Sequence, residues 1–350
     1  MPSITKPAVT HPSLQRNSLG LTIRDYEGTM STLCAGCGHD SVTAAIVRAL
    51  WELAIPPHMI AKLSGIGCSS KTPTYFVSGA HGFNSAHGRM PAIATGANAA
   101  NRDLIYIGVS GDGDSLSIGL GQLAHAIRRN VRMVYILENN GVYGLTKGQF
   151  SASADVGSRS KRGDPNCFAP IDPVDLGLSI GATFIARSFS GDKRQLVPIL
   201  EAAVAHRGFA LIDVISPCVT FNDHEGSTKS YLYTREHDIH ATYTDFVPPR
   251  DEIVASIPSG GITIPMHDGS LVRFRDVPEN YDPTNRESVE AYLHDRREAG
   301  EIATGLLYLD PDVPDMHAIA NTADRPLTQV PYEDLCPGSA ALDKLQEAFR

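Results

Sequence analysis

Residues 104–140 read LIYIGVSGDGDSLSIGLGQLAHAIRRNVRMVYILENN, and this stretch decides the fold class. Its first seven residues and residues 133–138 are almost continuously apolar, which is typical of parallel strands covered on both faces. Between them, apolar residues recur at the spacing of one helix face, at Leu116, Leu120, Leu123 and Ile127. The stretch therefore predicts a strand, a helix and a second strand, which is the repeating unit of a parallel α/β sheet.

Further strands and helices are expected to continue this alternation along the chain. Strands are predicted over residues 59–65, 183–187 and 209–216. Helices are predicted over residues 40–53, 90–100, 173–180 and 193–206. The sequence therefore predicts an α/β fold with a doubly wound, mainly parallel sheet, together with a polar, mobile loop over residues 150–170.

The ends of the predicted strands carry the residues of greatest chemical interest. In doubly wound sheets, ligands bind beyond the carboxyl ends of the strands. Residues with metal-binding or polar side chains follow four of the predicted strands, namely Cys68, Asp112, Asn140 and Cys218. We therefore expect these four side chains to gather at one edge of the sheet.

The character of the sequence changes after about residue 245, and we expect three parts. They are an N-terminal arm, an α/β domain and a C-terminal extension that wraps the core or a partner, over residues 1–30, 31–245 and 246–350. Within the extension, Asp268–Gly269 between two short β-prone runs predicts a hairpin.

The overall composition argues against several classes of protein. The chain has 350 residues, of which 42% are hydrophobic and 20% charged, as in ordinary globular proteins. Its formal net charge of −9 argues against nucleic acid as a partner, because nucleic-acid-binding surfaces are basic. No apolar run approaches the roughly 18 residues of a membrane span. The first residues lack a secretory signal, so we expect a cytoplasmic protein.

The segment GDG at residues 111–113 is followed by 25 residues and then by Asn139–Asn140. One helix and one strand fill this interval, so its two ends are expected side by side. Gly111 and Gly113 allow the backbone to approach a phosphate closely, and the following helix offers free N–H groups to the anion. The spacing therefore predicts a site for a diphosphate.

The same segment also contains ligands for Mg²⁺, which prefers hard oxygen atoms. Asp112 supplies a carboxylate oxygen, Asn140 an amide oxygen and Val142 a backbone carbonyl. The plain alternative is a tight strand-to-helix turn beside an unrelated pair of asparagines. A nicotinamide-binding site is a third possibility, but the GxGxxG pattern is absent at this turn.

Four of the six cysteines lie on either side of this motif, in CAGCGH (34–39), GIGCSS (65–70) and SPCVTF (216–221). Without a secretory signal, grouped cysteines more often bind metal than form disulfides. Four thiolates suit a structural zinc ion or an iron–sulfur cluster, and their spacing alone leaves that choice open. We expect the remaining two, Cys167 and Cys336, to be free thiols.

As a set, these motifs resemble those of thiamine diphosphate enzymes, specifically the β subunits of 2-oxoacid:ferredoxin oxidoreductases. The resemblance runs from about Cys34 to Pro249 and continues weakly through residues 281–310. It implies the thiamine diphosphate-binding fold and the coenzyme A-dependent oxidative decarboxylation of a 2-oxoacid. It also implies that electrons pass through a [4Fe–4S] cluster to ferredoxin.

The resemblance further implies the ligands of each group. The cluster would be bound by Cys34, Cys37, Cys68 and Cys218, and Mg²⁺ by Asp112, Asn140 and Val142. The wider cofactor site would include Gly111, Asp112, Gly113, Asp114, Asn140, Val142, Gly144, Leu145, Cys68 and Ser69. The pyrimidine-binding half would lie on an α subunit, so the chain is expected to be active only in an αβ heterodimer, two of which pair.

Two side chains are candidates for contact with reacting groups. Lys71, three residues after Cys68, could pair with the distal carboxylate of a substrate such as 2-oxoglutarate, with Leu145 lining the same pocket. A solvated lysine or a phosphate contact is equally compatible with its position.

His87, in a His-Gly-Arg segment, could contact the diphosphate or assist proton transfer, and a purely structural histidine is the alternative. His39, beside Cys37, is expected to support the cluster ligands rather than to bind metal.

Other substrates and other classes of protein remain open on the sequence. The same chemistry on pyruvate or another 2-oxoacid would keep the fold and change the pocket. A non-redox thiamine diphosphate enzyme with a structural zinc ion would not need an iron–sulfur cluster. A zinc-stabilised binding module would leave the Asp112 and Asn140 spacing unexplained.

Overall fold

The computed structural model describes residues 4–7, 11–159, 163, 165–249, 261–336 and 338–349. Within these residues the largest sheet has eight strands in the order β2-β1-β3-β4-β8-β7-β13-β9. In that order they span His81–Asn84, Ile60–Ser64, Ile105–Gly111, Met133–Asn139, Phe209–Ile215, Phe184–Phe189, Ile302–Leu309 and Asp238–His240. Neighbouring strands are parallel except for β13 and β7, which confirms the predicted mainly parallel sheet.

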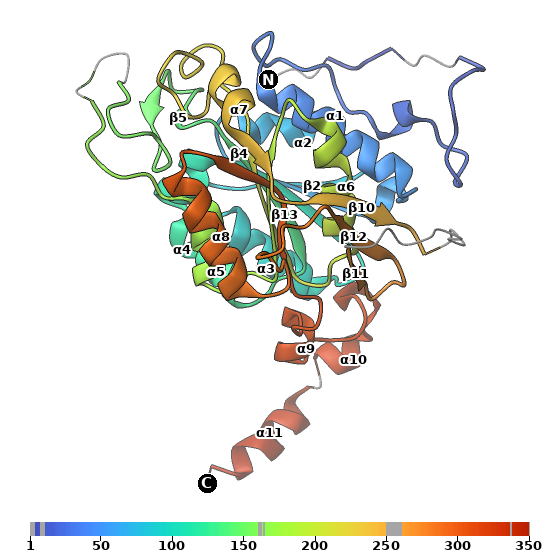
Figure 1. The fold of residues 1–350 in the computed structure, drawn as a ribbon. Coiled ribbons are helices and arrows are strands. Elements are labelled where there is room, and N and C mark those ends of the chain that lie inside the picture. The colour runs from blue at the N-terminus through green and yellow to red at the C-terminus, as the bar shows by residue number, and fades with distance from the viewer. Residues whose placement is uncertain are drawn as a thin grey trace.

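Helices cover both faces of this sheet (Figure 1). One face packs against α1 (Gly38–Glu52) and α6 (Lys193–Ala205). The other packs against α3 (Met90–Ala100), α4 (Leu120–Arg128), α5 (Pro173–Ser179) and α8 (Arg286–Glu298). Because both faces are covered, the central strands are buried along their length, as the continuous apolar runs predicted.

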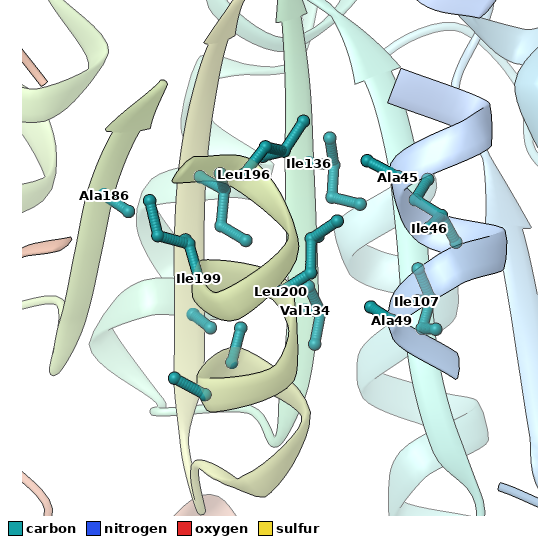
Figure 2. Packing of buried hydrophobic residues seen from close by; sticks show 14 of the residues in the cluster. Ala45, Ile46, Ala49, Ile107, Val134, Ile136, Ala186, Leu196, Ile199 and Leu200 are labelled. Atoms are coloured by element: carbon teal, nitrogen blue, oxygen red, sulfur yellow. The ribbon is translucent and has the colours of Figure 1, made fainter. Parts of the chain in front are cut away.

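The packing of α1 and α6 on the sheet shows why their sequences form helices. Apolar residues at helical spacing point from both helices onto the strands, as Figure 2 shows for Ala45, Ile46, Ala49, Leu196, Ile199 and Leu200. They contact side chains of the strands below, including Ile107, Val134, Ile136 and Ala186. This double-sided core holds β3, β4 and β8 in a fixed register, so the residues that follow these strands are placed rigidly.

Several short elements complete the described chain. A small antiparallel sheet has the order β10-β12-β11, over Tyr243–Val247, Leu271–Arg275 and Ile262–Pro265. β11 and β12 are the expected hairpin around Asp268–Gly269. A two-stranded ribbon contains β5 (Val142–Tyr143) and β6 (Gln149–Phe150). The short helices are α2 (Thr72–Tyr75), α7 (Tyr231–His237), α9 (Met316–Ala320) and α10 (Tyr332–Leu335).

The residues after 245 contribute to the core as well as to the surface. Strand β13, in this region, lies between β7 and β9 in the main sheet and is buried from Ala303 onward. The last helix, α11 (Ser339–Glu347), instead extends away from the body of the molecule (Figure 1). The division into an arm, a domain and an extension remains a prediction. No helix among the described residues is both long and apolar enough to cross a membrane.

Candidate functional site

The four central strands β1, β3, β4 and β8 are parallel neighbours, so their carboxyl ends lie at one edge of the sheet. β3 ends at Gly111, immediately before Asp112, and β4 ends at Asn139, immediately before Asn140. β1 and β8 lead into Cys68 and Cys218. The sheet order therefore brings the motifs of four separate sequence segments to the same edge.

Asp112 is the centre of a buried hydrogen-bond group at this edge. Its side chain is 1% exposed, and its Oδ2 accepts hydrogen bonds from Ser151 Oγ at 2.5 Å, Ser153 Oγ at 2.6 Å and Gly141 N at 2.9 Å. Burial raises the pKa of the Asp112 carboxyl, whereas the two serines oppose that rise. All the hydrogen bonds that the described residues make to this carboxylate go to Oδ2, so Oδ1 is left for another ligand.

Ser151 and Ser153 belong to the predicted polar loop, yet their side chains are buried. Both are buried, and Ser153 Oγ also donates to the Asn139 side chain at 2.9 Å. Their hydroxyls compensate the burial of a carboxylate, which would otherwise be costly. Nothing in the local pattern identified them, because the contact with Asp112 spans about 40 residues and depends on the path of the chain after β6.

The turn after β3 leaves no room for a side chain at Gly113. A Cβ atom at this position would lie 2.5 Å from the ring of Tyr143, whose hydroxyl donates to Gly113 O at 2.8 Å. The chain then forms a π-helical turn over Gly113–Ile118 before α4 begins. Glycine is therefore required here by close packing, and the backbone of the turn can come near a ligand.

Asp114 differs from Asp112 in how its two carboxylate oxygens are bonded. Its Oδ2 accepts from Ile66 N at 3.1 Å and Ser110 Oγ at 2.9 Å, and its Oδ1 accepts from Gly88 N at 2.7 Å. Both carboxylate oxygens are thus bonded to the protein. Asp114 joins the loop after β1 and the loop before α3 to the end of β3, so it positions the loops that surround the cleft.

One small cleft collects most of the predicted cofactor residues. Its cavity volume is about 20 Å³. Its lining residues are His39, Ile66, Gly67, Cys68, Ser69, Gly111, Asp112, Gly113, Asp114, Asn140, Val142, Tyr143 and Gly144. The predicted site residues that do not line it are Lys71, His87, Leu145, Cys34, Cys37 and Cys218. One cysteine of the group, Cys68, therefore lies at the same cleft as the diphosphate motif.

Two of the four cysteines, Cys68 and Cys218, approach one another around Gly144. A Cβ atom on Gly144 would lie 3.3 Å from Cys68 Sγ and 3.7 Å from Cys218 Sγ. Cys37 begins α1 as its N-cap, and its amide donates to Cys34 O at 3.0 Å. Burial raises the pKa of the Cys37 thiol to about 12, with a contribution from nearby Cys218. Burial also raises the pKa of Cys68, which is influenced by both Cys218 and Cys34.

Burial thus disfavours the thiolate form of Cys37 and Cys68. Thiolates in such surroundings need a positive partner. Among the described residues, however, no three His, Cys, Asp or Glu side chains converge on a point where they could hold a single metal ion. Cys167 and Cys336 are exposed and unpaired by disulfide, as expected.

A family model described as the C-terminal TPP binding domain of thiamine pyrophosphate enzymes matches residues 65–214. A 2-oxoacid:ferredoxin oxidoreductase subunit beta from Sulfolobus is 41% identical over 222 residues, which cover 63% of this chain and 70% of that protein. The 2-oxoglutarate oxidoreductase subunit KorB of Mycobacterium tuberculosis is 42% identical over 63% of this chain and 58% of its own length.

The chain belongs to the family of 2-oxoacid:ferredoxin oxidoreductase β subunits. A solved structure agrees with this assignment over nearly the whole chain. It is the 2-oxoglutarate:ferredoxin oxidoreductase from Magnetococcus marinus with 2-oxoglutarate, coenzyme A and succinyl-CoA bound. Its TM-score is 0.71 at 29% identity, and the match covers 89% of this chain and 92% of that chain. The chain is thus an oxidoreductase subunit with a thiamine diphosphate-binding fold.

In this β subunit, a second buried network lies behind the cysteines. His39 Nδ1 lies 2.6 Å from Ser216 Oγ and 3.4 Å from Glu138 Oε2, and Thr72 Oγ1 donates to Glu138 at 3.0 Å. Burial lowers the pKa of His39 to about 4 and raises that of Glu138 well above its usual value. His39 therefore supports the loops that carry the cysteines. Glu138, Thr72 and Ser216 were not found from the sequence, since Glu138 sits within an otherwise apolar strand.

The two candidates for contact with reacting groups lie at the margin of the cleft of this β subunit. Lys71 ends the short 3₁₀ helix Ser69–Lys71 and is half-buried, and its charge opposes the rise in the pKa of Cys68. His87 is exposed, and Leu145 is 49% exposed beside Gly144. The two candidates, Lys71 and His87, and the neighbouring Leu145 therefore present side chains that another molecule or subunit could contact.

Proposed function

We propose that the chain is the β subunit of a 2-oxoglutarate:ferredoxin oxidoreductase. The reaction would convert 2-oxoglutarate and coenzyme A to succinyl-CoA, CO₂ and a proton, with two electrons passed singly to ferredoxin. The observation that carries the proposal is that Cys68 lines the same cleft as Asp112 and Asn140. The Mycobacterium tuberculosis KorB relative and the Magnetococcus structure are both named for 2-oxoglutarate, which supports this substrate over other 2-oxoacids.

The diphosphate motif would hold thiamine diphosphate through Mg²⁺. Asp112 Oδ1, the Asn140 amide oxygen and the Val142 carbonyl are suited to the metal, and the turn at Gly113 would approach the phosphates. When bound, thiamine diphosphate supplies the electron sink for loss of CO₂ from the 2-oxoacid. Ser151 and Ser153 would keep Asp112 in its ionised, metal-binding orientation by holding its other oxygen.

The four cysteines would hold a [4Fe–4S] cluster beside the same cleft. In such a cluster each thiolate binds its own iron, so the sulfur atoms surround the cluster and need not converge on one point. The close approach of Cys68 Sγ and Cys218 Sγ at Gly144 is compatible with this arrangement. The relatives named as ferredoxin oxidoreductases favour a cluster over zinc, because electron transfer to ferredoxin needs a redox centre and zinc is not redox-active.

A partner subunit is expected to complete the site. The cleft volume of about 20 Å³ is far smaller than a cofactor of this size requires. We infer that the remaining wall is supplied by an α subunit carrying the pyrimidine-binding half, in a dimer of αβ heterodimers. Exposed His87 and Leu145 are available to line the completed site. Lys71 would then face the distal carboxylate of 2-oxoglutarate.

Anaerobic co-purification with the α subunit tests this function. The complex should contain about four irons per β chain and should reduce ferredoxin or viologen with 2-oxoglutarate only when coenzyme A is present. The β chain alone should show no turnover. Zinc in place of iron would overturn the redox assignment. Turnover with pyruvate and none with 2-oxoglutarate would retain the family reaction and refute the proposed substrate.

A further inference from the structure

Three arginines lie at the edge of the sheet opposite the cleft. Arg102 precedes β3, Arg132 immediately precedes β4 and Arg207 precedes β8. Because β3, β4 and β8 are adjacent and parallel, the residues before them come together at the amino edge of the sheet. The strands that are followed by Asp112, Asn140 and Cys218 at their carboxyl ends are thus preceded by three arginines at their amino ends.

The three arginines line one cavity of about 280 Å³, together with His267 and part of the segment 312–318. Ligand pockets for organic molecules usually measure about 300–1,000 Å³. The cavity is therefore large enough for a small ligand. It is separate from the cleft between Cys68 and Asp112, because it lies at the other end of the same strands.

Positive charge in this cavity is not balanced by direct ion pairing. Within the described part of the chain, none of the three guanidinium groups forms an ion pair with a carboxylate. Asp312 and Asp315 also line the cavity, and Asp315 and Asp103 both act electrostatically on Arg132. Asp315 Oδ1 accepts a hydrogen bond from Ala318 N at 2.9 Å as the cap of α9. These carboxylates compensate part of the positive charge, but among the described residues none is paired directly with one of the three guanidinium groups.

Two buried histidines beside the arginines also have free ring nitrogens. His206 and His317 are each 2% exposed, and neither His206 Nδ1 nor His317 Nε2 has a hydrogen-bond partner within the described residues. Burial lowers the pKa of both imidazoles, and the charge of Arg132 adds to that effect, whereas Asp315 opposes it at His317. Neither histidine lines the cavity, so the two imidazoles lie beside the proposed site rather than in it.

Each arginine also follows a helix, namely α3, α4 or α6, and cations are favourable near helix C-termini. That effect explains an arginine at each position separately. It does not require the three groups to line one cavity, where their mutual repulsion is unfavourable. Convergence of guanidinium groups is the usual way in which proteins recognise phosphate, because the planar fork donates two parallel hydrogen bonds.

We propose that Arg102, Arg132 and Arg207 form a binding site for a small phosphate-bearing anion, separate from the thiamine diphosphate cleft. Diphosphate itself and the phosphate chain of a nucleotide share the chemistry that this cavity recognises. The proposal does not depend on the substrate assigned above, since it rests on the opposite edge of the sheet.

Calorimetric titration of the αβ complex with inorganic diphosphate tests the site, in the presence of Mg²⁺ and saturating thiamine diphosphate to occupy the cleft. Arg132→Gln should weaken binding at least about tenfold, which corresponds to about 1.4 kcal/mol. Arg207→Gln should also weaken the binding of diphosphate. Because Arg207 is exposed, this variant is a second test if Arg132→Gln does not fold. Arg194→Gln is the matched control, because Arg194 is exposed at the opposite end of α6.

A parallel titration with ADP distinguishes the two sources of phosphate. Tighter binding of ADP with the same dependence on Arg132 would identify a nucleotide site, and equal binding would identify a diphosphate site. Absence of binding by either compound up to about 1 mM overturns the proposal. Binding that is unchanged in both Arg132→Gln and Arg207→Gln overturns it as well, because the anion would then be held elsewhere.

Discussion

The carboxyl and amino edges of strands β3, β4 and β8 differ in how they can hold an anion. The carboxyl edge has a buried carboxylate, an asparagine and a thiol, followed by the start of a helical turn. These three side chains are neutral or acidic, so they suit phosphate held through backbone N–H groups and a metal ion. The amino edge has guanidinium groups, which bind phosphate directly. One sheet thus presents two chemically opposite environments.

The two edges also differ in how tightly their residues are held. Asp112 is 1% exposed, and its Oδ2 accepts three hydrogen bonds. Arg207 is exposed, and Arg102 and Arg132 are half-buried. Substitutions at the carboxyl edge should therefore disturb both folding and function, whereas those at the amino edge should alter binding with little effect on the fold.

The largest effect is expected from Asp112→Ala. The substitution removes a proposed metal ligand and leaves the donors Ser151, Ser153 and Gly141 N without their acceptor, which costs about 1–3 kcal/mol of unfolding free energy. Thiamine diphosphate affinity, measured calorimetrically with Mg²⁺, should fall by more than about 100-fold. The control is Asp103→Ala at the amino edge, which should change neither quantity. Retention of wild-type cofactor affinity in Asp112→Ala would contradict the proposed metal site.

Substitution of one cysteine should separate cluster ligands from free thiols. Cys218→Ser should reduce iron from about four per chain to a small fraction, because each proposed thiolate holds one iron. Iron content and the visible absorption of the anaerobically purified complex measure this loss. Cys167→Ser is the matched control and should retain full iron, since Cys167 is exposed and away from the cleft. Equal iron in both variants would refute the ligand assignment.

A more moderate effect is expected from Lys71→Ile. Loss of the ammonium group should lower kcat/KM for 2-oxoglutarate by roughly 10- to 100-fold, as a lost charged contact of about 1.5–3 kcal/mol predicts. The value for pyruvate, which has no distal carboxylate, should be nearly unchanged. Lys71→Arg keeps the charge and should restore part of the preference. An unaltered ratio of the two substrates in Lys71→Ile would remove Lys71 from the substrate site.

The smallest effect is expected on the face between the two edges, at Glu201 on α6. Burial, followed by a hydrogen bond with Glu52, raises the pKa of Glu201 to about 8, above the usual 4.5. The folded state therefore binds more protons than the unfolded state between these values. Stability from this group is complete below about pH 4.5 and is lost as the pH rises through 8.

Glu201→Gln should remove this pH dependence without affecting either edge. The difference in unfolding free energy between pH 5 and pH 8 should shrink by on the order of 1 kcal/mol. Denaturant unfolding at several pH values measures it. Arg48, which pairs with Glu52, favours the charged form and limits the effect. An equal pH dependence in wild type and Glu201→Gln would show that the carboxyl pair does not determine it.

Much of the fold could be predicted from periodicity, because helices and strands differ in the spacing of apolar residues. Strands β3, β4 and β8 lie within one residue of their predicted limits, and α3 spans its predicted range. The prediction was weaker after residue 245. The buried strand β13 was assigned to an extension, since a short apolar run does not show which sheet it joins.

The candidate site was only partly accessible from the sequence. Motif spacing placed Asp112 and Asn140 together, because one helix and one strand must bring neighbouring turns side by side. It did not find Ser151 or Ser153, which reach Asp112 through the return of a later loop. The arginines at the amino edge precede predicted strands, so the argument applied to the carboxyl edge could have located them once the strand order was known.

The sequence by itself determined the α/β class, the diphosphate motif, the group of four cysteines and the family. These follow from local periodicity and short motifs, which are encoded in consecutive residues. Only the tertiary structure decided the strand order, the hydroxyls that hold Asp112, the network behind the cysteines and the convergence of Arg102, Arg132 and Arg207. These features join residues far apart in the chain, and their contacts are selected by packing of the whole sheet rather than by any local pattern.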